Sequence, residues 1–143
     1  MSRRETITAD IVQILKAADD PRFGLVSREP FDVTQLSRQQ FPAVYVTTAD
    51  ETRRDLTIRG KSGLREGRME IVLTGWVNGA EVDRMRNDLI ERVEEALDDD
   101  RTRDAVAYST QVTEIAVDTN IVAPYGSVQI TVEVVYNFQR GQS

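Results

Sequence analysis

The densest group of side chains that could do chemistry is a run of three carboxylates, Asp98-Asp99-Asp100. Carboxylates hold Mg²⁺, and two ions held in this way support phosphoryl transfer in metal-dependent nucleases. Consecutive residues point in different directions, so these three converge on one ion only if a loop wraps around it. The run follows the last apolar residue of a predicted helix. We therefore favour a solvated helix end, with a small metal-dependent nuclease as the alternative.

A second candidate is the segment Gly60-Lys61-Ser62-Gly63, which contains the Gly-Lys-Ser letters of a phosphate-binding loop. Such a loop needs another glycine five residues before the Gly-Lys pair, a strand before it and a helix after it. Asp55 occupies the position of that glycine, and the residues after Gly63 are typical of a strand. Spacing and context both fail, so we interpret this segment as a turn.

The 143 residues include no cysteine and no histidine. These absences exclude disulfides, thiolate nucleophiles, Cys/His zinc sites and a Ser-His-Asp triad, and they remove the commonest general base. No run of about 18 apolar residues occurs, so no membrane span is expected. The net charge of −6 argues against tight nucleic-acid binding, which depends on basic contacts to phosphates. We predict a protein without a conventional active site.

Apolar periodicity predicts the elements that must position these residues. Helices are predicted over 8–18 and 80–97, and strands over 42–48, 69–77, 111–120 and 127–138. The last strand alternates over its whole length, with one face buried and the other in solvent. The predicted class is α+β, a mainly antiparallel β-sheet with two amphipathic helices packed on one face. We expect a single domain over 1–143.

Local signals refine these elements. Thr6 or Thr8 is expected to cap the first helix, and Asn78 or Gly79 to begin the second. Gly75 lies inside an otherwise apolar strand, which predicts a change of register near it.

A charged segment from 50 to 68 lies between the first two predicted strands. It holds six basic and four acidic residues, a local charge of +2, and its glycines predict a long mobile β-hairpin arm. Few aromatic residues accompany the basic ones, so single-stranded nucleic acid is a poor partner. Contact with an acidic face of a partner protein and simple solvation are the two interpretations. The candidate interface residues are the six basic ones, Arg53, Arg54, Arg59, Lys61, Arg65 and Arg68.

Five segments, taken in order, carry a resemblance to a known family. They are the helix with Ile7, Ile11 and Leu15, the strand Phe41-Pro42-Ala43-Val44-Tyr45-Val46, the charged hairpin before Met69-Glu70-Ile71-Val72-Leu73, the helix over 88–97 and the strand over 130–138. In this order and spacing the chain resembles the tail-terminator, or tail-completion, proteins of tailed bacteriophages. Neighbouring neck and head–tail completion families share the layout.

The resemblance implies a structural virion protein that is related in fold to tail-tube subunits, is not an enzyme and needs no cofactor. Such proteins form a homo-oligomeric, hexameric ring that caps the tail tube, ends tail polymerisation and joins the tail to the head connector. The implied partners are the tail-tube protein, the connector or neck protein, and DNA that passes through the lumen without specific binding. The implied location is the tail or neck of the virion, with assembly in the host cytoplasm. A monomeric adaptor and another neck protein are the alternatives, and the small nuclease is less favoured.

Overall fold

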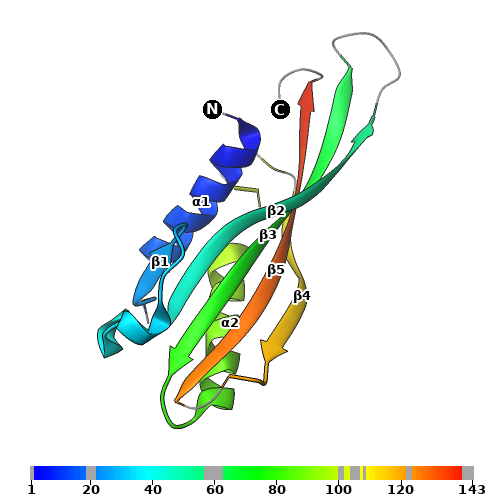
Figure 1. Ribbon diagram of the computed structural model, residues 1–143. Coiled ribbons are helices and arrows are strands. Elements are labelled where there is room, and N and C mark those ends of the chain that lie inside the picture. The colour runs from blue at the N-terminus through cyan, green and yellow to red at the C-terminus, as the bar shows by residue number, and fades with distance from the viewer. Residues whose placement is uncertain are drawn as a thin grey trace.

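The computed structural model describes residues 2–18, 22–56, 63–99, 102–103, 107, 109–121 and 124–139. In chain order the elements are α1 (Arg3–Ala17), β1 (Leu25–Ser27), the 3₁₀ helices η1 (Val33–Gln35) and η2 (Arg38–Gln40), β2 (Ala43–Asp55), β3 (Leu64–Asn78), α2 (Val82–Asp98), β4 (Ser109–Asp118) and β5 (Tyr125–Gln139) (Figure 1). The strands form one sheet in the order β1-β2-β3-β5-β4. The β1–β2 pair is parallel and the others are antiparallel, which confirms the predicted α+β class.

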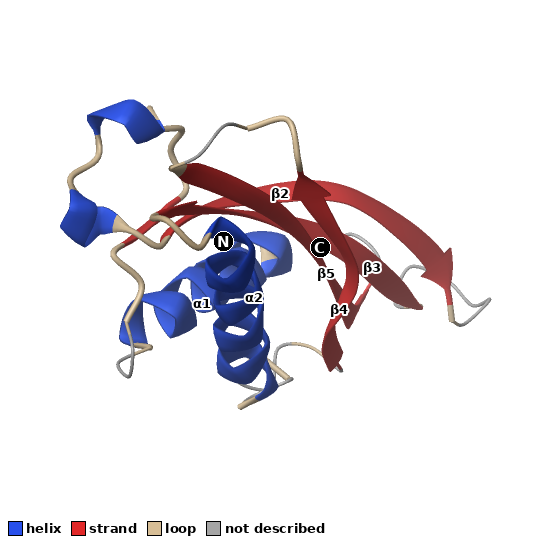
Figure 2. Cartoon of the chain, turned by 90° about the horizontal axis from the view of Figure 1, so that it is seen from below, coloured by secondary structure: helices blue, strands red, loops and turns tan. Residues whose placement is uncertain are grey.

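Both helices cover the same face of the curved sheet, as predicted (Figure 2). Their core-facing side chains are at most 1% exposed, namely Ile7, Ile11 and Leu15 from α1 and Leu89, Val93 and Leu97 from α2. Fully burying one such side chain contributes about 1.5–3 kcal/mol, so the sheet is what stabilises these helices. No helix in the described part of the chain is both long and apolar enough to span a membrane.

The alternation of β5 produces the predicted buried face. Its members Val128, Ile130, Val132, Val134, Tyr136 and Phe138 are all buried on the helix side of the sheet. One residue predicted to face solvent, Val135, is buried instead. β5 is a central strand, and Val135 pairs with Arg68 of β3 on one side and Ser109 of β4 on the other. On the outer face, burial of a residue in β5 therefore depends on the side chains of the neighbouring strands. The alternation along β5 alone does not predict it.

The predicted register change at Gly75 is wrong. β3 pairs without interruption there, with Val44 of β2 on one side and Val128 of β5 on the other. The glycine is needed for packing, because a Cβ at this position would lie 2.3 Å from Leu89 Cδ2 of α2. The bulge of this pair lies instead in β2, between Thr48 and Glu51.

The helix ends also differ from the prediction. Ser2 caps α1, since its Oγ accepts a hydrogen bond from the backbone N–H of Glu5 at 3.1 Å. The Thr6 and Thr8 hydroxyls donate to carbonyls of the preceding turn rather than capping the helix. The cap position of α2 is Glu81, which makes no capping hydrogen bond through its side chain. The Asp19-Asp20-Pro21 segment, whose proline predicts the end of the first helix, lies outside the described residues.

The two strands of the charged segment are longer than predicted. β2 continues to Asp55 and β3 already begins at Leu64, so most of the segment is sheet. β5 runs alongside as far as Gln139, opposite Leu64. The arm, residues 50–68, contributes two strands, the end of β2 and the start of β3, and the end of β5 pairs with β3 as the third strand. This three-stranded ribbon projects beyond both helices (Figure 1).

We predict that Gly75→Ala destabilises the fold. The added methyl group overpacks the contact with Leu89, which costs about 1–3 kcal/mol in free energy of unfolding. Chemical denaturation measures this loss. In a Leu89→Ala background the same change has room and costs less, and equal costs in both backgrounds would contradict the proposed contact.

Candidate assembly interface

The described part of the arm is a paired, ion-paired projection of the sheet. Leu56 donates a backbone hydrogen bond to Leu64 O at 2.9 Å, so the strands remain paired up to the turn. The described basic candidates all form ion pairs within this chain: Arg53 with Glu51, Arg54 with Glu66 (3.1 Å), Arg65 with Asp55 (2.9 Å), and Arg68 with Glu66 (2.9 Å) and Glu133 (3.4 Å). Four basic residues therefore match four acidic ones in the described arm. The other two candidates, Arg59 and Lys61, lie outside the described residues, and they account for the whole local charge of +2.

Glu66 organises the outer face of the arm. Burial raises the pKa of its carboxyl group, but hydrogen bonds from Arg54 and Arg68 outweigh burial and hold the pKa below its usual range. The carboxylate therefore stays ionised, and its contribution to stability is lost only as the pH falls through this lowered pKa. Arg54 and Arg68 therefore contribute to the stability of the arm, while their side chains remain 66% and 46% exposed.

Glu51 joins the arm to the first helix. Its side chain is only 4% exposed, and its carboxylate accepts hydrogen bonds from Arg4 of α1 (2.6 Å), from Arg53 and from the Tyr136 hydroxyl (3.0 and 3.1 Å). The bulge in β2 turns Glu51 to the helix side and leaves Asp50 exposed. Arg4 also donates to the carbonyl of Ala49 within the bulge at 3.2 Å. Sequence reasoning missed this site because no local pattern marks a bulge there.

Aromatic side chains seal the inner face of the arm. The Tyr136 ring lies on Gly67, where a Cβ would come within 2.7 Å of its Cε1. Tyr136 stacks with Phe138 at 5.6 Å between ring centroids, and the Arg53 guanidinium lies 4.6 Å from the Phe138 centroid. Burial, together with the hydrogen bond to Glu51, raises the pKa of Tyr136. The arm is thus held by packing as well as by ion pairs.

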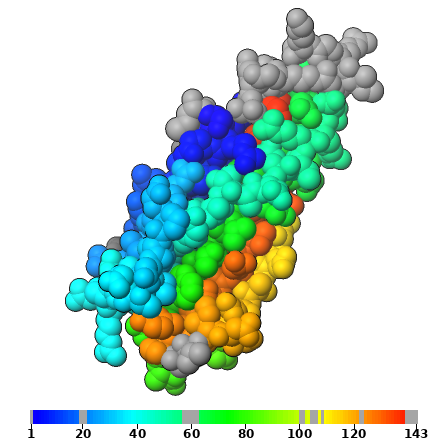
Figure 3. Space-filling model, in the orientation of Figure 1, coloured from blue at the N-terminus to red at the C-terminus, as the bar shows by residue number. Residues whose placement is uncertain are grey.

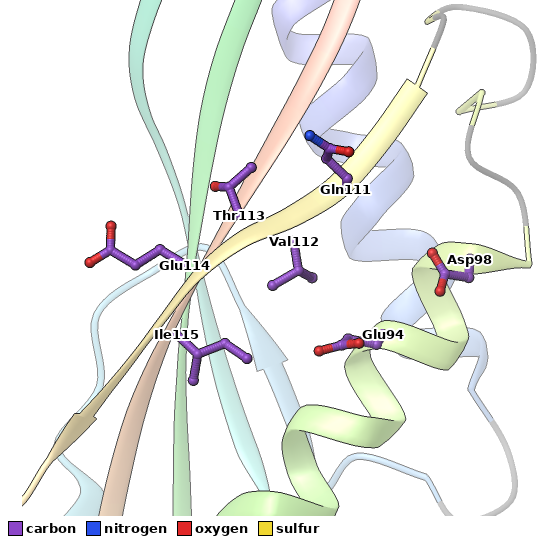
Figure 4. A pocket seen from close by; sticks show the side chains of 7 residues that line it. All are labelled: Glu94, Asp98, Gln111, Val112, Thr113, Glu114 and Ile115. Carbon is purple, nitrogen blue, oxygen red and sulfur yellow. The ribbon is translucent and has the colours of Figure 1, made fainter.

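An acidic groove lies between the end of α2 and the edge strand β4 (Figure 4). Its volume is about 390 Å³. Glu94 and Asp98 of α2 face Val112 and Ile115 of β4 across it, whereas Glu114 points away from the helix. A bulge between Val112 and Glu114 keeps Ile115 on the helix side of the sheet, opposite Ile130. The groove therefore combines carboxylates on one wall with apolar side chains on the other.

The carboxylate run of the sequence belongs to this region. Asp98 borders the groove, Asp99 is exposed, and Asp100 lies outside the described residues. Within the described ranges, no three carboxylates are grouped as a metal ion would require. The Gly60-Lys61-Ser62 turn also lies outside them, and Gly63 leads directly into β3, so a strand follows it as predicted.

A second cavity, of about 220 Å³, lies at the end of the sheet away from the arm, next to the last residues of β3. Its apolar lining includes Phe41, Val77 and Leu89, and its charged lining consists of Arg38, Asp88 and Arg92. With two cations and one anion, this cavity is positive where the groove is negative.

Comparison with known proteins leaves the family open. No protein-family model matches the chain, and no curated protein matches it. Among solved structures, the chain is similar to a chain in the "Virion of native gene transfer agent (GTA) particle", with a TM-score of 0.49 and 10% sequence identity. The similarity covers 92% of this chain and 94% of that one. At this identity and TM-score, neither function nor partners follow from the likeness.

We predict that Glu51→Gln loosens α1 from the arm. Arg4 and Arg53 would lose a charged acceptor, which costs about 2 kcal/mol in free energy of unfolding. Asp55→Asn is the matched control, because the Asp55 side chain is 51% exposed and its ion pair with Arg65 lies at the surface. Denaturant titration compares the two variants, and equal losses would contradict a special role for Glu51.

We also predict that Tyr136 is a late-titrating tyrosine. Because its pKa is raised, the stability that the neutral phenol contributes is complete below the ordinary tyrosine pKa of about 10 and is lost as the pH rises through the raised value. When the pH is raised and phenolate absorbance is followed, one tyrosine should ionise at a higher pH than the others, and Tyr136→Phe should remove this step. A late step that survives in Tyr136→Phe would belong to another tyrosine.

Proposed function

We propose that this chain is a non-enzymatic structural protein of a tailed-phage virion. More specifically, we propose a tail terminator that forms a ring on the tail tube, ends tail polymerisation and joins the tail to the head connector. The observation that carries the proposal is the arm, in which β2, β3 and β5 remain paired as they project beyond the helices. Near its end Leu56 and Leu64 remain 41% and 40% exposed. Exposed apolar side chains on such a projection suit contact with another protein.

The far edge of the sheet supports the same proposal. β4 is the last strand in the sheet order, and Ile115 and Val117 on it are 42% and 43% exposed. Edge strands with exposed apolar side chains are places where copies of a protein join. An arm at one end and an open edge on another side provide two different surfaces, which a head-to-tail ring requires.

The order of elements supports the tail-terminator role among virion functions. An N-terminal helix, a strand, a charged hairpin, a long strand, a second helix and a closing strand are present in the order on which the resemblance rests. In such a ring the tube protein and the connector would bind opposite faces. DNA would pass through the lumen, where acidic side chains would repel it and prevent it from sticking.

A measurement of mass and shape tests the ring. We expect the purified chain, alone or with the tube protein of the same phage, to sediment as a closed oligomer. Electron microscopy should show this oligomer as a ring with a central opening. A strict monomer at every concentration, with and without tube protein, would contradict the proposal.

Loss of the gene in a phage tests the role. A tail terminator limits tube growth, so we expect its absence to give tails of uncontrolled length that lack heads, as seen by electron microscopy. Supplying the wild-type chain should restore both tail length and head joining. Tails of normal length that fail only to join heads would instead identify another neck or head–tail completion protein.

A further inference from the structure

We infer that the acidic groove between α2 and β4 binds the end of the arm of a second copy of this chain. The arm end is defined here as the segment from Leu56 to Leu64, whose glycines predict a turn. Residues 57–62 of this segment lie outside the described part of the structure. This inference deepens the proposed function and rests on it, because a ring subunit must bind a copy of itself.

The groove has the chemistry for such an occupant. Glu94 and Asp98 of α2 line the groove. Glu91 lies three residues before Glu94 and therefore on the same face of the helix, one turn beyond the lining residues. Val112 and Ile115 form the facing wall, and Ile115 is 42% exposed. A carboxylate wall beside an apolar wall suits a segment that carries both cations and aliphatic side chains.

The arm end has the complementary chemistry. Leu56 and Leu64 stand exposed at the last paired positions of β2 and β3. The turn between them contains Arg59 and Lys61 and no acidic residue, so it carries a charge of +2. The other four arginines of the arm form ion pairs within the chain. The unbalanced positive charge of the arm is therefore concentrated next to its exposed apolar side chains.

Strand pairing excludes docking within one chain. Leu64 is held opposite Gln139 of β5, whereas Glu114 beside the groove is held opposite Thr131. These two positions on β5 are eight residues apart, which is about 26 Å at roughly 3.3 Å per residue. The ends of β2 and β3 that precede and follow the arm end lie beyond the helices at one end of the molecule (Figures 1 and 3). The groove would therefore receive the arm of another copy.

Charge also selects this groove over the second cavity. That cavity is lined by Arg38 and Arg92 with one carboxylate, Asp88, so it would repel a turn that carries two positive charges. The contact proposed here joins two different surfaces, arm end and groove. It can therefore repeat from copy to copy, and it forms a closed ring if the rotation between neighbouring copies divides a full turn evenly.

Charge exchange tests the contact in the full-length chain. The groove variant carries Glu91→Lys and Glu94→Lys, and the arm variant carries Arg59→Glu and Lys61→Glu. We expect each to weaken self-association about ten-fold or more in sedimentation velocity, and high salt to weaken the wild type. The chain with all four changes should regain association, because the charges are exchanged but still opposite.

Glu29→Lys with Glu70→Lys is the matched control, since it makes the same change of charge at exposed residues outside the groove. Thermal unfolding confirms that every variant folds. Association that survives both sets of reversals, or fails to return in the four-fold variant, would overturn this inference and leave the ring standing. Self-association that persists while tube-protein binding is lost would assign the groove to that protein and overturn it too. A wild-type chain that is always monomeric would overturn both proposals.

Discussion

The buried carboxylate of Glu51 is the constraint on which the shape of this protein depends. A carboxylate that is almost fully removed from water must be surrounded by donors, and here they come from α1, β2 and β5. The same interaction requires the bulge in β2, since without the extra residue Asp50 would face inward instead. One polar group therefore sets the position of the first helix, the register of β2 and the start of the arm.

Beyond that point the sheet continues without helices to cover it. Gly67 admits the Tyr136 ring, Phe138 stacks on it, and Arg53 covers Phe138 with its guanidinium group. On the outer face Glu66 pairs with two arginines, one of which also pairs with Glu133. In this way the described part of the ribbon is packed and ion-paired without a second layer. This property connects the physical chemistry of the arm with the proposed role in assembly.

Sequence reasoning predicted the helical layer and the inner face of the sheet well, because burial against one core imposes a period on the apolar residues. The stripe through Leu89, Val93 and Leu97 and the alternation of β5 are both of this kind. It failed in the arm, where charged residues occupy both faces of β2 and β3 and no period is visible. It also misassigned Gly75. This glycine leaves room for the side chain of Leu89 on α2, a contact between residues fourteen positions apart that no local pattern describes.

The sequence by itself determined the class of fold, the absence of cysteine and histidine chemistry, and the local charge of +2 over residues 50–68. These properties depend on composition or on short-range periodicity. Only the tertiary structure decided that Arg53, Arg54, Arg65 and Arg68 are engaged within the chain. It also decided that carboxylates of α2 face apolar residues of β4 across a groove. Pairing of charges depends on distance in space, and that distance follows from strand register and bulges rather than from spacing along the chain.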